Sequence, residues 1–158
     1  MNEGEWAAVI RPLTVKEIPL TFPLAVAALA SNPRMGTSAF NPRSFAAAVA
    51  GVVGKEGVFL GAFRPNGDVV GALLATACND PLTGVRCAIE HVVAVQREFR
   101  GGGIAEALVE EFETWARGQG ATFIQQSVCH GGEDRGKMLE GRGYVQWDRH
   151  YAKVISNG

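Results

Sequence analysis

Residues 95–105 read VQREFRGGGIA, and this stretch decides the fold class. The run before it, 86–95, is mostly apolar on both faces, which predicts a central β-strand. The run after it places apolar side chains on one helical stripe, at Ile104, Leu108, Phe112 and Trp115. Consecutive Gly residues let the backbone turn tightly between the two runs. We therefore expect a buried strand, a glycine turn and an amphipathic helix in succession.

The glycine turn has the features of an anion-binding site. A helix start presents unpaired N–H groups and a partial positive charge, which suit a phosphate or pyrophosphate. Arg100 adds a charged donor at the mouth of the turn. The stretch is not a P-loop, because no Lys follows the glycines, and Glu106 stands where a dinucleotide motif has its third Gly. A plain tight turn before a core helix is the alternative.

Working outward, the chain predicts a mixed α/β fold in the order β-α-α-β-β-β-α-β-α-β. Thr14 and Glu17 have the spacing of a capping box, so a first helix starts there, short or kinked because of Pro19 and Pro23. A second helix follows Asn41, and others are expected over 104–117 and 133–142. Strands are expected at 7–13, 58–63, 69–77, 86–95, 121–129 and, as one strand or a pair, 144–154.

The composition favours one globular domain over residues 1–158. The 47% of hydrophobic residues is enough for a core at this length. A net charge of −1 gives no general reason to bind nucleic acid or an anionic membrane. Three Cys without a CxxC pair argue against a disulfide framework or a Cys-based zinc site, so we expect no metal. No stretch reaches the about 18 apolar residues of a membrane span, and residues 1–6 lack the positive charge of a secretory signal. We expect a cytoplasmic protein.

The segment Arg100–Ala105 is similar to the Gln/Arg-x-x-Gly-x-Gly/Ala motif of the GNAT acetyltransferase superfamily. Gly143-Tyr144, after a short predicted helix, resembles the Gly-Phe pair that closes the fourth helix of these enzymes. The chain also looks like a small phage or bacterial member of the superfamily. The resemblance implies the GNAT fold, with a mixed central sheet of about 6–7 strands flanked by about four helices.

The resemblance also implies acetyl-CoA as the cofactor. In the superfamily the backbone amides of the glycine loop bind the coenzyme A pyrophosphate, and the preceding strand pairs with the pantetheine arm. The matching positions here are Val93, Ala94, Val95, Arg100, Gly101, Gly102, Gly103, Ile104 and Ala105. The implied activity is N-acetyl transfer to a primary amine of a small molecule or a protein. Homodimers are common in the superfamily.

Two side chains are candidates for the catalytic base. Alternation along the strand places His91 on the face of Val93 and Val95, and Glu90 on the other face. A His four residues before that last Val resembles the serotonin N-acetyltransferase branch, in which this His helps to remove the proton of the amine. Glu90 is the second candidate. The alternatives are a buried His bonded to a backbone carbonyl and, for Glu90, a carboxylate that orients His150 or an Arg or that faces solvent at an opening of the sheet.

The general acid of the superfamily is missing from its usual position. Many members carry a Tyr four residues before the Gly-Phe pair, where this chain has Leu139. Tyr151, Cys129, His130 or water could instead protonate the departing thiolate. The alternative to an enzyme is therefore a non-catalytic acyl-CoA-binding or regulatory module of the same fold.

Overall fold

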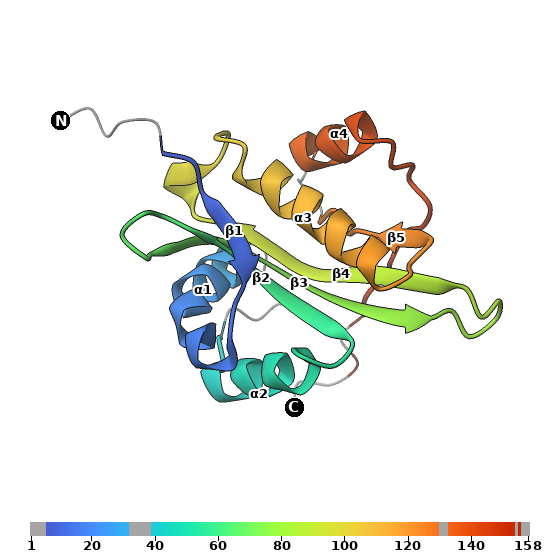
Figure 1. Ribbon diagram of the computed structural model, residues 1–158, viewed down its shortest axis with the longest axis horizontal. Helices are drawn as coiled ribbons and strands as arrows, with labels where there is room; N and C mark the ends of the chain where they lie inside the picture. Colours follow the sequence, from blue (N-terminus) through green and yellow to red (C-terminus); the bar gives the residue numbers. More distant parts are fainter. Residues whose placement is uncertain (1–5, 32–38, 130–132, 154, 156–158) are drawn as a thin grey trace.

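Five strands form one sheet in the order β1-β2-β3-β4-β5 (Figure 1). The computed structural model describes residues 6–31, 39–129, 133–153 and 155. The strands are β1 (Val9–Pro12), β2 (Gly57–Phe63), β3 (Val69–Asn79), β4 (Arg86–Val95) and β5 (Phe123–Gln125). The pairs β1/β2, β2/β3 and β3/β4 are antiparallel, and β5 runs parallel to β4. This is the mixed α/β fold that the sequence predicts.

Helices cover both faces of the sheet. They are η1 (Val15–Thr21), α1 (Phe22–Ser31), α2 (Pro42–Val52), η2 (Arg97–Phe99), α3 (Ile104–Gly118) and α4 (Glu133–Gly141). The segments η1 and η2 are 3-10 helices. Figure 1 shows α1 and α2 on one face of the sheet and α3 and α4 on the other. None of the helices in the described residues is long and apolar enough to cross a membrane.

The capping box predicted at Thr14 and Glu17 and the helix cap predicted at Asn41 are confirmed. The backbone N–H of Thr14 donates to Glu17 Oε2 at 2.8 Å, and Arg11 donates to both oxygens of the same carboxylate. Pro19 lies inside the 3-10 segment η1, and α1 begins only after it. The side chain of Asn41 caps α2, because its oxygen accepts from a backbone N–H of the first turn at 3.0 Å.

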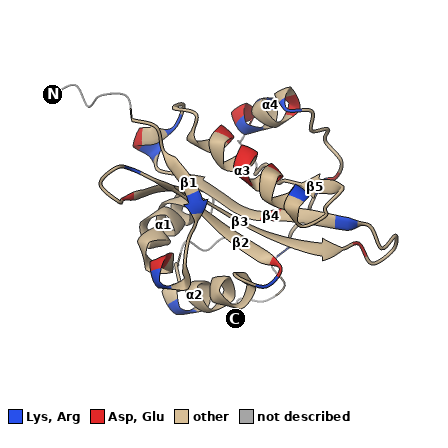
Figure 2. Cartoon of the chain, in the orientation of Figure 1, with Lys and Arg blue, Asp and Glu red and all other residues tan. Residues whose placement is uncertain are grey.

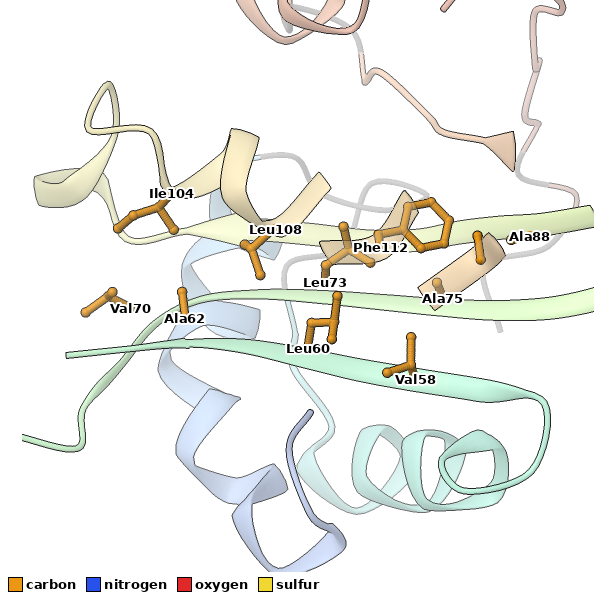
Figure 3. Packing of buried hydrophobic residues seen from close by; sticks show 11 residues of the cluster. Val58, Leu60, Ala62, Val70, Leu73, Ala75, Ala88, Ile104, Leu108 and Phe112 are labelled. Carbon is orange, nitrogen blue, oxygen red and sulfur yellow. The ribbon is translucent and has the colours of Figure 1, made fainter. Parts of the chain in front are cut away.

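Two apolar clusters hold the layers together. The larger one, called here the α3 cluster, lies between α3 and the sheet, and Figure 3 shows its side chains gathered between the strands and this helix. Leu108 and Phe112 are fully buried in it, and burying such a side chain stabilises the fold by about 1.5–3 kcal/mol. The second cluster joins η1, α1 and α2 to the other face and includes Leu24, Val49 and Phe59.

The sheet has fewer strands than the 6–7 expected. Within the described residues there are five, and 144–153 form no strand. β5 covers only 123–125 instead of 121–129, because its pairing is limited to Cys87–Ile89 of β4. An extended segment becomes a strand only where a neighbour accepts its backbone hydrogen bonds. In the predicted closing segment, the side chain of Trp147 remains 82% exposed.

Candidate functional site

The glycine turn connects the end of β4, through η2, to the start of α3. Gly101 and Gly103 have φ angles of 80° and 82°, in the left-handed region that L side chains disfavour. Gly103 is the N-cap residue of α3 and offers no side chain to the first turn. The N–H groups of that turn therefore remain available to an anion.

A hollow of about 460 Å³ opens beside this turn. Its lining includes residues of the turn and of the segment before β1, namely Trp6, Phe99, Arg100, Gly102, Gly103 and Ile104. The ring of Trp6 packs edge-on against Phe99, with centroids 5.6 Å apart. Arg100 Nε donates to the carbonyl oxygen of Val95 at 3.1 Å, which ties the turn to the end of β4. The volume lies in the range of small-molecule sites.

The strand β4 has an open edge beside the turn. Its pairing with β5 ends at Ile89, which faces Gln125. In the part of the chain that the structure describes, no strand pairs with 90–95 on this side. The backbone N–H and C=O groups of an open edge can pair with an extended ligand, as in strand addition. The segment Val93–Val95, predicted to bind pantetheine, lies on this edge and is half-buried.

Glu90 is buried where β4 and β5 separate. Only 4% of the residue is exposed, and its Oε2 accepts from Arg135 Nη2 at 3.0 Å and from the Ser127 N–H at 3.2 Å. Arg135 also donates to Gln126 Oε1 at 2.9 Å. The carboxylate thus joins β4 to α4 and to the segment after β5. These contacts match the alternative prediction for Glu90, in which its carboxylate orients an Arg side chain.

A β-bulge lies at His91. The pairing of β3 with β4 shifts between Leu74 and Ala75, so that His91 is the extra residue on β4. The side chain of His91 is exposed, and its Nε2 lies 2.7 Å from Thr76 Oγ1 on β3. The predicted alternative of a buried His bonded to a carbonyl is therefore wrong.

The bulge also changes the faces of the two candidate bases. Val93 and Val95 pack against the α3 cluster, and Glu90 lies on the same face, two residues from the buried Ala88. His91 contacts Thr76 of β3, which directly follows Ala75, a member of the α3 cluster. Since side chains alternate along β3, Thr76 and His91 lie on the opposite face of the sheet. The predicted orientation, with His91 beside the two Val residues, is wrong because an extra residue interrupts the alternation.

The position expected to carry a general acid is apolar. Leu139 is buried in α4. The nearby phenol of Tyr144 accepts from Gln126 Nε2 at 2.7 Å and donates to Glu113 Oε1 at 3.1 Å. Burial raises the pKa of Tyr144 to about 12. The Tyr144 hydroxyl is therefore protonated at neutral pH and engaged on both sides.

The substitutes predicted for the missing Tyr lie at the surface or outside the described residues. Tyr151 is 89% exposed, and Cys129 is exposed as well. Neither side chain has a hydrogen-bond partner among the residues that the structure describes. His130 is outside those residues.

Thr76 and Arg135 contact the candidate bases but were not among the predicted site residues. The side chain of Arg135 is only 17% exposed, because it turns from α4 toward Glu90. No local pattern marks such a contact between distant segments. The contact of Thr76 could have been predicted from the hairpin of β3 and β4. Counting equal numbers of residues away from its turn on both strands pairs Thr76 with Ile89, close to His91.

Residues 32–139 match the family model described as "Acetyltransferase (GNAT) family". No curated protein matches the chain.

Solved structures share the fold at low sequence identity. A ribosomal-protein-alanine N-acetyltransferase from Brucella melitensis biovar Abortus 2308 is 22% identical, with a TM-score of 0.71 over 96% of this chain and 100% of that one. Glucosamine-6-phosphate N-acetyltransferase from Arabidopsis thaliana is 14% identical, with a TM-score of 0.73 over 96% and 100%. An aminoglycoside 6'-N-acetyltransferase from Acinetobacter baumannii is 17% identical, with a TM-score of 0.70 over 96% and 99%.

Proposed function

Since the chain belongs to the acetyltransferase (GNAT) family, we propose that it transfers an acetyl group from acetyl-CoA to a primary amine. Members of this family generally carry out acetyl-CoA-dependent N-acetylation, and the family and the structural neighbours that are N-acetyltransferases support an acyltransferase. The observation that supports the proposal most directly is the uncapped start of α3 beside the open edge of β4. The amine belongs to a small molecule or a protein.

The residues around the glycine turn suit coenzyme A. The positive φ angles at Gly101 and Gly103 shape a turn with free N–H groups, and a hollow of about 460 Å³ adjoins it. We assign the pyrophosphate to the N–H groups of Gly101–Ala105, with Arg100 as a charged donor. We assign the pantetheine arm to the edge of Val93–Val95. When bound, acetyl-CoA supplies a thioester whose carbonyl carbon the amine attacks.

The proton chemistry is assigned to His91. The amine must be neutral to attack, so a base removes its proton while the N–C bond forms and the C–S bond breaks. His91 is exposed at the bulge of β4, whereas Glu90 is buried and bonded to Arg135. We therefore give Glu90 a structural role at the split between β4 and β5. The thiolate takes its proton from water, because Leu139 offers no donor.

The distribution of charge and thiols supports the remaining features of the proposal. Figure 2 shows mainly Glu on α3 and both signs of charge on α4, with no basic stripe on either helix, so nucleic acid is not the proposed partner. The three free Cys suit a reducing compartment, which supports a cytoplasmic enzyme. We propose a homodimer on the strength of the family alone.

The second candidate function is a non-catalytic acyl-CoA-binding or regulatory module. Leu139 supports it, because an apolar side chain is buried where the family often has its acid. The two functions share the cofactor site and differ in turnover.

Thermal unfolding with acetyl-CoA, CoA, ATP and NAD tests the cofactor. A ligand at 100 times its Kd adds about 2.7 kcal/mol, which raises Tm by roughly 5–11 °C for a chain of this size. We expect a rise with acetyl-CoA and CoA only. An equal rise with ATP or NAD, or none with CoA, would contradict the cofactor assignment.

Two Gly→Ala variants of α3 localise the cofactor. Gly103→Ala puts a methyl group on left-handed backbone at the helix start, so we expect most of the acetyl-CoA rise in Tm to disappear. Gly118→Ala, at the far end of the same helix with open space around it, should keep the rise. A Gly103→Ala protein that binds as well as the wild type would exclude the glycine turn as the site.

Release of free thiol from acetyl-CoA in the presence of primary amines separates the two functions. The panel contains arylalkylamines, aminoglycosides and an N-terminal alanine peptide. Turnover above the rate without amine supports the transferase. Saturable acetyl-CoA binding without turnover on any amine supports the binding module.

A further inference from the structure

The contact between His91 and Thr76 is the shortest polar contact of the candidate base. The two side chains come from neighbouring strands and meet at the β-bulge, with His91 Nε2 and Thr76 Oγ1 2.7 Å apart. This distance is that of a well-formed hydrogen bond. An exposed His on a strand normally samples several rotamers, so a fixed partner limits its ring orientation.

Thr76 is suited to hold the ring. Its β-branched side chain has few χ1 rotamers, and β3 is a central strand paired on both sides. The other ring nitrogen, Nδ1 of His91, makes no hydrogen bond within the described part of the chain. A neutral imidazole has one N–H and one lone pair, and a Thr hydroxyl can meet Nε2 as acceptor or as donor. Only the arrangement in which Oγ1 accepts leaves a lone pair on Nδ1.

We propose that Thr76 is a positioning residue whose hydroxyl oxygen accepts the Nε2–H of His91 and leaves the Nδ1 lone pair to take the proton of the acceptor amine. This inference rests on the proposed function. The proton leaves the attacking nitrogen and binds Nδ1, while the proton on Nε2 stays on the ring, hydrogen-bonded to Thr76 Oγ1. The resulting imidazolium then returns its Nδ1 proton to water.

Within the described residues, no ion pair or hydrogen bond engages Nδ1 of His91. The C-terminal segment packs Trp147 against Phe123 of β5, on the Cys87 side of the sheet, and brings Asp148, Arg149 and His150 to that side. Glu90 lies on the other face of the sheet, bonded to Arg135. The helix α1, which packs against β3 and β4, contains no titratable side chain. On the face of His91, the neighbouring titratable groups of the sheet are the thiols of Cys78 and Cys87, which contact each other with sulfurs 3.5 Å apart.

The face of His91 also sets the direction from which the acceptor approaches. The proposed pantetheine edge runs along β4, and His91 points from the same strand toward the side of α1 and α2. The amine therefore reaches the thioester from that side, with the rest of the acceptor next to α1.

The tautomer of His91 is measured by nitrogen-15 NMR of the ring at alkaline pH, where neutral imidazoles are observed. The His91 signals are identified by their loss in His91→Gln. We expect a protonated Nε2 and an unprotonated Nδ1 in the wild type and in Thr76→Ser. In Thr76→Val, which keeps the shape but lacks the hydroxyl, we expect a mixture of both tautomers. A wild-type ring protonated at Nδ1 would overturn the proposal.

Kinetics on the fastest amine of the panel tests the consequence for the reaction. Thr76→Val should lower kcat about tenfold at an unchanged KM for acetyl-CoA, and Thr76→Ser should recover most of it. An equal Tm of the two variants shows that folding is not the cause. An unchanged kcat in Thr76→Val would overturn the positioning role and leave the transferase intact. A wild type that turns over no amine would overturn the proposed function and the proton transfer, whatever the tautomer.

Discussion

At the scale of single residues, Glu90 and His91 are neighbours with opposite surroundings. Glu90 is buried against Arg135, whereas His91 is exposed and contacts Thr76. Regular strand alternation turns the two consecutive side chains to opposite faces, and the extra residue at the bulge puts Val93 and Val95 on the face of Glu90. The two candidate bases are thereby distinguished by access: only one of them can reach a substrate.

His91→Gln should lower kcat by about 100-fold or more, because Gln reaches the Nε2 position but cannot take a proton. The rise in Tm with acetyl-CoA should be unchanged, since His91 faces away from the α3 cluster, on which Val93 and Val95 pack. Steady-state kinetics and thermal unfolding measure the two effects. A variant with full kcat would show that the base lies elsewhere.

Arg135→Met should destabilise the protein by about 3 kcal/mol, because it leaves the carboxylate of Glu90 buried without its cation. Urea unfolding measures the loss. The double variant Glu90→Gln with Arg135→Met should recover part of it, since no unpaired charge remains. The control Arg117→Met removes an exposed partner of Glu113, 3.7 Å away, and should change stability by less than about 0.5 kcal/mol. Equal losses in Arg135→Met and Arg117→Met would rule out the structural role of Glu90.

At the scale of elements, helix starts serve different purposes in this chain. The start of η1 is closed by Glu17, which binds Arg11 and the Thr14 N–H, and the start of α2 is closed by Asn41. The start of α3 has only Gly103 and remains open. A cap that stabilises one helix is thus absent from the helix whose free N–H groups are proposed to bind coenzyme A.

The cap at η1 makes stability depend on pH. The hydrogen bonds from Arg11 and then Thr14 lower the pKa of Glu17 to about 2. A lowered pKa means that the carboxylate stabilises the fold above about pH 4.5, and that this contribution is lost as the pH falls toward 2. Glu17→Gln should therefore be less stable than the wild type at pH 6, and the difference should shrink between pH 4.5 and 2. Urea midpoints at several pH values measure this.

The control for the pH series is Glu140→Gln, whose side chain is exposed on α4. Its difference from the wild type should stay small throughout. A Glu17→Gln difference that remained constant down to pH 2 would contradict the role of the carboxylate charge.

At the scale of the whole molecule, two apolar clusters on the two faces of one sheet keep the site in place. α3 is anchored by the cluster beneath it, so the glycine turn at its start is fixed relative to the end of β4 (Figure 3). The other face carries α1 and α2, toward which His91 points. The proposed cofactor and acceptor positions thus belong to different layers and meet at β4.

Phe112→Ala should destabilise the protein by about 3–5 kcal/mol, because the ring is fully buried in the α3 cluster and leaves a cavity. Urea unfolding measures the change. Leu82→Ala, at a side chain that is 93% exposed, should stay within about 0.5 kcal/mol of the wild type. A Phe112→Ala protein of wild-type stability would mean that α3 is not held by this cluster.

Features that depend on neighbouring residues could be predicted from the sequence alone. The capped starts at Thr14 and Asn41, the glycine turn at 101–103 and the apolar stripe of α3 follow from spacing along the chain, and so does the family resemblance. Each of these is decided within a few residues, where backbone preferences and hydrophobic periodicity are sufficient.

Only the tertiary structure decided which side chains meet. The bulge at His91, its contact with Thr76 and the turn of Arg135 toward Glu90 bring together residues from 15 to 45 positions apart. The expected closing strand depended on the same kind of information, because a segment such as 144–153 is a strand only if a partner lies beside it. Local patterns carry no record of strand pairing, since the hydrogen bonds that define it join distant parts of the chain.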